Sequence, residues 1–335
     1  MIWTWILIFI VSIYFLVKAA DYFTDYSEKL GKILNLPNFI IGVLIVAIGT
    51  SIPELATSIM GVQAGEAEFL SGNVLGTVII NVLLGLGIAI LVVKNKVKFN
   101  WDIVSNDLPF FAAAIFLVII SLSDGVFTTV EAVIFVIGFF VYIFYAYLAQ
   151  KSFQEKVKAR LDRQIKKEIN EEVNSVKEHK HLSKDPISKL KVVLIILASL
   201  GVILLASYFV VESILQISSM LQVGTTVMAA TAVALGTSLP EIVVAISAAR
   251  RRNYDMMIGN ILGSSIFDIF MIFGFVGMFT TLIITPVIYW IMIPFLVATF
   301  LLLWLTLIDK KITKTEAMMF ILIFFMFIGK MFEVF

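Results

Sequence analysis

Ten long apolar segments constrain the fold of this chain more than any other feature of its sequence. A helix needs roughly 20 predominantly apolar residues to cross the hydrocarbon core of a bilayer. Hydrophobic residues make up 60% of the 335 positions and charged residues only 15%, whereas a soluble domain would carry charge on most of its elements. The sequence therefore predicts an all-α integral membrane protein with ten transmembrane helices. Their expected centres lie near Ile10, Ile48, Leu83, Ile115, Phe135, Leu204, Val233, Ile269, Leu296 and Ile323.

Basic residues in the loops predict the orientation of these helices. They follow each odd-numbered span, whereas the loops after the even-numbered spans are acidic or lack basic residues. Loops rich in Lys and Arg remain in the cytoplasm, so we expect a multi-pass protein of the cell membrane with both termini extracellular. The first apolar segment has no basic residues before it and no small-residue cleavage site after it, which favours a retained helix. The short basic loops contain Lys29, Lys32, Lys94, Lys96, Lys98, Arg250, Arg251, Arg252, Lys310, Lys311 and Lys314.

One long hydrophilic segment, 150–190, follows the fifth span and mixes Lys and Arg with Glu. At about 40 residues it is near the lower limit for independent folding, so we interpret it as a cytoplasmic loop; a regulatory cation site there is the alternative. Both histidines, His179 and His181, lie in it and are expected to be solvated. Cysteine is absent, which excludes disulfides, thiolate metal sites and cysteine nucleophiles.

An internal repeat divides the chain into two halves. Residues 47–54 read AIGTSIPE and residues 234–241 read ALGTSLPE, a separation of 187 positions, the difference between 241 and 54. Residues 72–81 (GNVLGTVIIN) and 259–268 (GNILGSSIFD) keep the same separation without a gap. Five spans per half is an odd number, so the second copy must enter the membrane from the opposite side. We therefore expect two inverted five-helix repeats, 1–149 and 191–335, with ion sites at their interface.

Three acidic residues lie at membrane depth: Glu54, Glu241 and Asp268. An ionisable side chain within an apolar span is a functional candidate, because it must face a bundle interior or a water-filled cavity. Pro53 and Pro240 lack the N–H that would bond the carbonyl four residues earlier. Each motif therefore predicts a break in its helix that exposes oxygen ligands.

The other polar side chains beside these acids carry oxygen. Residues four positions apart share one helix face, which aligns three pairs: Thr50 with Glu54, Thr77 with Asn81, and Ser264 with Asp268. Ser51 and Ser238 add hydroxyls next to the breaks, and Thr237 is the counterpart of Thr50. Calcium takes six to eight oxygen ligands and needs no nitrogen or sulfur. The oxygens therefore predict a site for calcium and sodium enclosed by four helices.

Several conspicuous residues have simpler explanations. Gly72 with Gly76, and Gly259 with Gly263, form small-xxx-small patterns that favour close helix packing. The paired Asn73 and Asn260 are better explained as caps or interhelical hydrogen bonders than as ion ligands.

These motifs resemble those of the cation/calcium exchanger superfamily, and most closely those of the prokaryotic sodium/calcium exchangers. The resemblance rests on GTSIPE and GNVLGTVIIN in the first half and on GTSLPE and GNILGSSIFD in the second. It implies exchange of sodium for calcium by alternating access, with no cofactor and one chain sufficient for transport. The four central ligand positions that it implies are Glu54, Asn81, Glu241 and Asp268. The other implied ligands are the carbonyls of Thr50 and Thr237 for calcium, and for sodium the carbonyls of Ala47 and Ala234 and the hydroxyls of Ser51, Thr77, Ser238 and Ser264.

Two departures bear on the transported ions. Val78 stands where the family often has an amide-bearing residue, and Val74, Leu75 and Gly76 stand where proton-coupled relatives carry a glutamate. Sodium coupling is thereby favoured over proton coupling, while potassium dependence stays open.

Other functional classes have less support. Channels usually build rings of ligands around an open pore, whereas broken helices in two inverted halves favour alternating access. Zinc proteolysis needs two histidines flanking a glutamate on a helix, and both histidines lie in the polar loop. The dispersed basic residues and net charge of +1 give no support for nucleic acid binding.

Overall fold

The computed structural model describes residues 2–34, 36–63, 67–93, 97–99, 103–149, 189–220, 231 and 233–332. Within these ranges the chain is helical except for four two-residue strands and the connecting turns. The expected cytoplasmic loop, including both histidines, lies outside the described residues up to position 188.

Five expected spans of the first half appear as helices, several of which contain π-helical turns. The spans and their connections are α1 (Ile2–Leu34); α2 (Asn38–Ile41), η1 (Gly42–Ala47), α3 (Ile48–Thr50) and α4 (Ile52–Gln63); α5 (Ala67–Ile80), η2 (Asn81–Leu86) and α6 (Gly87–Leu91); α7 (Ile103–Asn106) and α8 (Leu108–Ser121); and a helix over Thr129–Ala149.

The second half repeats this order with almost the same internal boundaries. Its elements are α10 (Lys189–Met220); α12 (Ala234–Thr237) and α13 (Leu239–Arg250); α14 (Tyr254–Phe267), η4 (Asp268–Phe273) and α15 (Gly274–Gly277); η5 (Ile288–Met292) and α16 (Ile293–Leu307); and α17 (Lys314–Met331).

Ten helical segments therefore occupy the ten expected positions. Among the described residues, 7 helices are long and apolar enough to cross a membrane. The helix α8 is apolar but shorter, with 14 residues. The remaining two positions hold α12 with α13, whose preceding residues are largely undescribed, and α17, which has charged residues near both of its ends.

The two prolines interrupt their helices where the sequence predicts. Ser51 separates α3 from α4, and Ser238 separates α12 from α13. Pro53 and Pro240 lie in the first turn after each interruption, where the missing N–H is tolerated. The chain direction is preserved, because the N–H of Ser51 still bonds the carbonyl of Ala47 at 3.0 Å.

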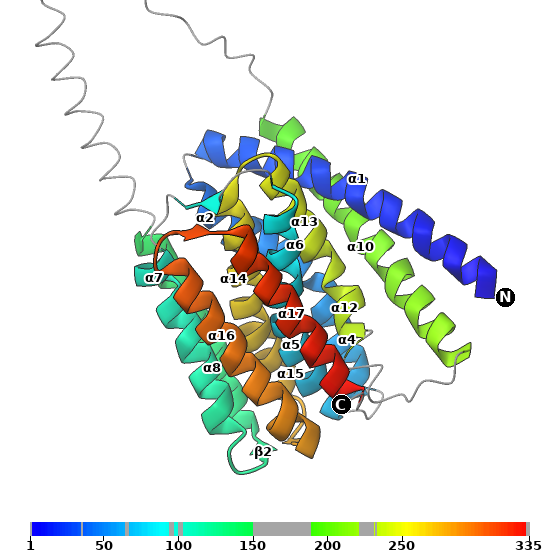
Figure 1. Ribbon diagram of the computed structural model, residues 1–335, viewed down its shortest axis with the longest axis vertical. Helices are drawn as coiled ribbons and strands as arrows, with labels where there is room; N and C mark the ends of the chain where they lie inside the picture. The colour runs from blue at the N-terminus through cyan, green and yellow to red at the C-terminus, as the bar shows by residue number, and fades with distance from the viewer. Residues whose placement is uncertain are drawn as a thin grey trace, which may run out of the picture.

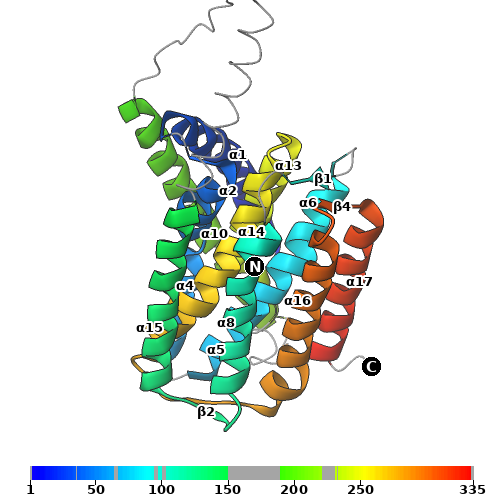
Figure 2. The same ribbon diagram turned by 90° about the vertical axis from the view of Figure 1, so that its left-hand side faces the viewer.

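Two small antiparallel ribbons show that the repeats are inverted. Strand β1 (Val97–Lys98) pairs with β4 (Lys311–Ile312), and β2 (Val126–Phe127) pairs with β3 (Leu282–Ile283). Strands β3 and β4 are the repeat counterparts of β1 and β2, because their residue numbers are higher by 185, the difference between 282 and 97. The pairing of residues is also repeated: Val97 pairs with Ile312 in one ribbon, and their counterparts Leu282 and Phe127 pair in the other. The ribbons lie at opposite ends of the molecule (Figure 2), as a two-fold axis in the membrane plane requires.

The same symmetry is visible in the helix starts. A capping box joins Thr128 to Glu131, whose carboxylate accepts from the Thr128 N–H at 2.7 Å. Thr313 and Glu316 repeat it 185 positions later, the difference between 313 and 128, with a distance of 2.6 Å. Each box satisfies N–H groups that the first turn of its helix leaves unpaired.

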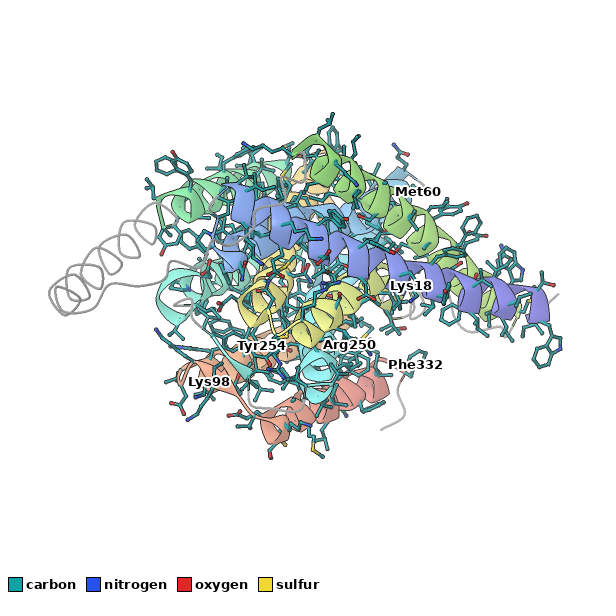
Figure 3. The ribbon with its side chains drawn as sticks, turned by 90° about the horizontal axis from the view of Figure 1, so that it is seen from above. Lys18, Met60, Lys98, Arg250, Tyr254 and Phe332 are labelled. Carbon is teal, nitrogen blue, oxygen red and sulfur yellow. The ribbon has the colours of Figure 1, made fainter. Side chains whose placement is uncertain are left out.

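The helices form a bundle with one oblique pair on its flank. The repeat counterparts α1 and α10 run side by side, tilted against the other helices (Figure 1). Seen from above, this pair lies opposite α16 and α17, and Arg250 and Tyr254 lie between them (Figure 3). The spans formed by α5 with η2 and by α14 with η4 lie in the interior and hold the site residues of the second motif.

The glycines of α14 permit the closest backbone contact in the interior. A Cβ on Gly259 would lie 2.4 Å from the carbonyl oxygen of Phe39, and one on Gly263 would lie 2.7 Å from the Cα of Val43. The prediction of close packing is confirmed for this pair. The corresponding partners of Gly72 and Gly76 would be residues 226 and 230, which lie outside the described residues.

Candidate ion-binding site

The helix interruptions place the two glutamates at the centre of the protein. Glu54 lies in the first turn of α4 and Glu241 in the first turn of α13, and their exposed fractions are 1% and 0%. Asn81 and Asp268 are the first residues of η2 and η4, and both are fully buried. The two glutamates therefore follow helix interruptions, whereas Asn81 and Asp268 begin π-helical turns, which frequently mark functional sites.

The buried carboxylates have few hydrogen-bond partners. Within the described part of the chain, both oxygens of Glu54, both oxygens of Asp268 and Oε2 of Glu241 accept no hydrogen bond. The three groups are close enough to interact electrostatically. Burying a carboxylate without a partner costs several kcal/mol. A cation among these oxygens would compensate that cost.

The hydroxyls beside the helix breaks are arranged differently in the two halves. Ser51 Oγ donates to Oε1 of Glu241 at 3.1 Å, across the interface between the repeats. Ser238 Oγ donates instead to the Ala234 carbonyl of its own helix, at 2.6 Å. That carbonyl also accepts from the Thr237 hydroxyl at 3.3 Å and from the Ser238 N–H at 3.0 Å.

The second motif contributes an amide and two hydroxyls. Asn81 Nδ2 is 3.5 Å from Ser264 Oγ, a long hydrogen bond, and the Ser264 hydroxyl donates to the Ile261 carbonyl at 3.1 Å. Oδ1 of Asn81 and Oγ1 of Thr77 are buried and, among the described residues, have no partner. Both oxygens are available as ligands.

Comparison with known proteins identifies the family. The profile described as sodium/calcium exchanger protein matches residues 4–148 and 191–332. The chain belongs to the sodium/calcium exchanger family. It is 30% identical to the sodium/calcium exchanger MaX1 of Methanosarcina acetivorans over 321 residues, 89% of each chain. It is also 28% identical to the inner membrane protein YrbG of Escherichia coli over 288 residues, 84% of this chain and 81% of that protein.

A solved structure of the family supports the fold across nearly the whole length. The sodium-calcium exchanger NCX_Mj, soaked with sodium and strontium, superposes with a TM-score of 0.78 at 25% identity and covers 98% of this chain and 99% of that one. The exchanger described here is thus a membrane antiporter for sodium and calcium, and not an enzyme. The resemblance read from the two pairs of motifs is confirmed.

Every expected site residue of the exchanger is buried. The residues with exposed fractions of 0% or 1% are Ala47, Thr50, Ser51, Glu54, Thr77, Asn81, Ala234, Thr237, Ser238, Glu241, Ser264 and Asp268. The described residues nevertheless contain no three His, Cys, Asp or Glu side chains grouped as ligands of one metal ion. Most oxygens of the expected set belong instead to hydroxyls, carbonyls and an amide.

The paired asparagines hold helices together. Asn260 Nδ2 donates to the backbone carbonyl of Glu241 at 3.0 Å, and Asn73 Nδ2 donates to Ser58 Oγ at 3.1 Å. The sequence left helix caps and interhelical hydrogen bonds as the two explanations, and the second is confirmed. The direct bond from Asn260 to the backbone of a site glutamate was missed, because nothing in the sequence ties it to that one carbonyl. The π-helical turns at Asn81 and Asp268 also leave no recognisable sequence signal.

Proposed function

We propose that sodium and calcium are exchanged through one shared set of buried oxygens. Calcium occupies the centre, between Glu54, Glu241, Asn81 and Asp268, where it also binds the carbonyls of Thr50 and Thr237. Sodium occupies positions around this centre. Their ligands are the carbonyls of Ala47 and Ala234 and the hydroxyls of Ser51, Thr77, Ser238 and Ser264.

One observation carries this proposal: the carboxylate oxygens of Glu54 and Asp268 are buried and accept no hydrogen bond from the described residues. A buried polar group without a partner is rare in proteins and calls for an explanation. Hard cations such as calcium and sodium bind carboxylate, carbonyl, amide and hydroxyl oxygens, and all four types surround these two side chains. The arrangement therefore fits the two ions of the family.

The shared site makes transport depend on alternating exposure. Glu54 belongs to the first repeat and Glu241 to the second, so rocking one repeat against the other opens the site to one side at a time. Ions of one kind must leave before those of the other bind, because they use the same oxygens. This competition couples the two fluxes.

Charge in the site predicts that exchange is electrogenic. Three carboxylates carry more negative charge than one calcium ion neutralises, and several sodium ions can occupy the surrounding positions together. The loaded states then differ in charge, and the membrane potential acts on the difference at about 2.3 kcal/mol per charge per 100 mV.

The orientation and the working unit belong to the same proposal. Arg250, Arg251 and Arg252 follow α13, and Lys310, Lys311 and Lys314 surround the start of α17. By the positive-inside rule these ends are cytoplasmic, in a cell membrane with both termini outside. Both halves of the site come from one chain, so a monomer is sufficient.

Uptake by reconstituted vesicles tests the proposal. Purified protein is placed in liposomes, and radioactive calcium uptake is measured with outward gradients of sodium, potassium or protons imposed separately. We expect uptake with the sodium gradient alone and a faster rate when the interior is positive. Uptake driven equally well by a proton gradient would support a proton-coupled exchanger. Uptake that requires potassium would support a potassium-dependent exchanger. Calcium flux without any counter-ion would indicate a channel.

A further inference from the structure

A cluster of polar contacts joins α1 to α13 at the end of the molecule that the basic residues mark as cytoplasmic. Arg251 Nη1 pairs with Asp25 Oδ1 at 2.8 Å, and Arg251 Nη2 donates to the backbone carbonyl of Asp21 at 3.0 Å. Ser247 Oγ donates to Asp21 Oδ1 at 2.7 Å. We call these four residues, Asp21, Asp25, Ser247 and Arg251, the α1–α13 latch.

The inverted repeat contains a second copy of this interface, between α10 and α4. The separation of 187 positions relates Asp21 to Tyr208, Asp25 to Glu212 and Met60 to Ser247. None of the latch contacts is repeated there among the described residues. Glu212 accepts a hydrogen bond from Gln216 of its own helix at 2.8 Å.

The second interface is open where the first is closed. Tyr208, Glu212 and Met60 line a cavity of about 510 Å³ between α10 and α4. The cavity also reaches Ile52 and Pro53, the two residues that precede Glu54 in α4. The two interfaces occupy corresponding places in the repeats, but polar contacts close the first and a cavity lies in the second. The sequence contributes to this difference, because Tyr208 and Met60 stand where the first interface has Asp21 and Ser247.

We propose that the α1–α13 latch is the cytoplasmic gate of the exchanger and that the cavity between α4 and α10 is its open counterpart. In the opposite state the latch separates and the cavity closes around Tyr208 and Met60. This inference rests on the alternating access proposed above. It assigns to Asp21, Asp25, Ser247 and Arg251 a positioning role in transport, although none of them is among the proposed ion ligands.

The exposure of the latch suits a contact that must open in every cycle. The side chains of Arg251 and Asp25 are 35% and 31% exposed, so water screens their attraction and the pair is weak. Asp25 also keeps a second partner, Lys29, at 2.7 Å, which stabilises its charge when Arg251 leaves. A fully buried ion pair would leave unpaired charges on opening and hold the gate shut.

Sided measurements of affinity test the latch. Arg251→Gln and Ser247→Ala should shift the population toward the state open to the cytoplasm. Apparent calcium affinity should then fall on the extracellular side and rise on the cytoplasmic side, each by roughly two- to fivefold. Lys32→Gln is the control, because Lys32 forms a similar ion pair with Glu28 within α1 alone. Equal losses on both sides would mean that the latch only stabilises the fold, and the proposal would be overturned.

Cross-linking provides a readout that does not depend on ion binding. The chain has no cysteine, so introduced pairs report unambiguously. The pair Asp21→Cys with Ser247→Cys should cross-link in the present conformation and block exchange until it is reduced. The pair Met60→Cys with Tyr208→Cys should cross-link only after the cavity closes. Normal exchange by the cross-linked first pair, or formation of both cross-links in one molecule, would refute the gate. If the two cross-links exclude each other but calcium uptake is not coupled to sodium, only the proposed ion site is refuted and the gate stands.

Discussion

The Ser51 hydroxyl donates to Glu241 of the opposite repeat at 3.1 Å, while its counterpart Ser238 donates to a carbonyl of its own helix. The two serines occupy identical places in the duplicated motif, so the difference lies in the conformation and not in the sequence. It accompanies the other asymmetry of the molecule, the closed α1–α13 latch opposite the cavity between α4 and α10.

This relationship predicts unequal effects of removing the two hydroxyls. Ser51→Ala should weaken extracellular calcium binding by roughly ten- to a hundredfold, because its hydroxyl holds Oε1 of Glu241 and hydrogen bonds to charged groups contribute about 1.5–3 kcal/mol. Ser238→Ala should have a smaller effect, since that hydroxyl bonds a carbonyl of its own helix and no carboxylate. Ser51→Thr keeps the hydroxyl and serves as the control. Calcium titration of vesicle uptake measures all three, and equal losses for the two alanines would contradict the assignment.

Neutralising either glutamate of the site should nearly abolish exchange. Glu54→Gln or Glu241→Gln removes a charge that calcium needs, and an amide replaces few of the lost interactions. The protein should still fold, because a neutral amide is less costly to bury than a carboxylate. Uptake by purified, monodisperse protein is the measurement, and Glu28→Gln near the end of α1 is the matched control. Near-normal flux in a folded variant would show that the central site is wrongly assigned.

The contact between α14 and the second span should be intolerant of a single methyl group. Gly259→Ala would place a Cβ 2.4 Å from the carbonyl oxygen of Phe39, and overpacking of this kind costs about 1–3 kcal/mol. Gly201→Ala is the control, because a Cβ there has no atom within 4 Å. Thermal unfolding in detergent should separate the two variants. A Gly259→Ala protein as stable as the control would mean that the helices pack less closely than described.

The duplicated capping boxes should contribute to stability without affecting ion coupling. Thr313→Ala and Thr128→Ala each remove a cap from the start of a helix, with an expected loss of about 0.5–2 kcal/mol. Both variants should unfold at lower temperature and, once folded, transport calcium with unchanged sodium dependence. A changed sodium dependence in either variant would tie that helix end to the transport cycle. Thr315→Ala, at the second residue of α17, controls for loss of a threonine alone.

Much of the architecture follows from local sequence properties. The spans were predictable because a helix must hide its backbone from lipid over about 20 residues, a pattern visible in any apolar stretch. The inverted arrangement followed from the repeated motif and the odd number of spans, and the two exchanged ribbons confirm it. Burial of Glu54, Glu241 and Asp268 followed from their position within apolar segments. Their role as ion ligands stays a prediction.

The sequence by itself thus determined the membrane fold, its two-fold repeat and the small set of residues able to bind a cation. Only the tertiary structure decided which distant partner each residue takes: Ser51 reaches Glu241, Asn260 reaches the carbonyl of Glu241, and Arg251 reaches Asp25. The physical reason is that duplicated halves encode two nearly equivalent arrangements. The choice between them depends on weak contacts among residues that are far apart in the chain.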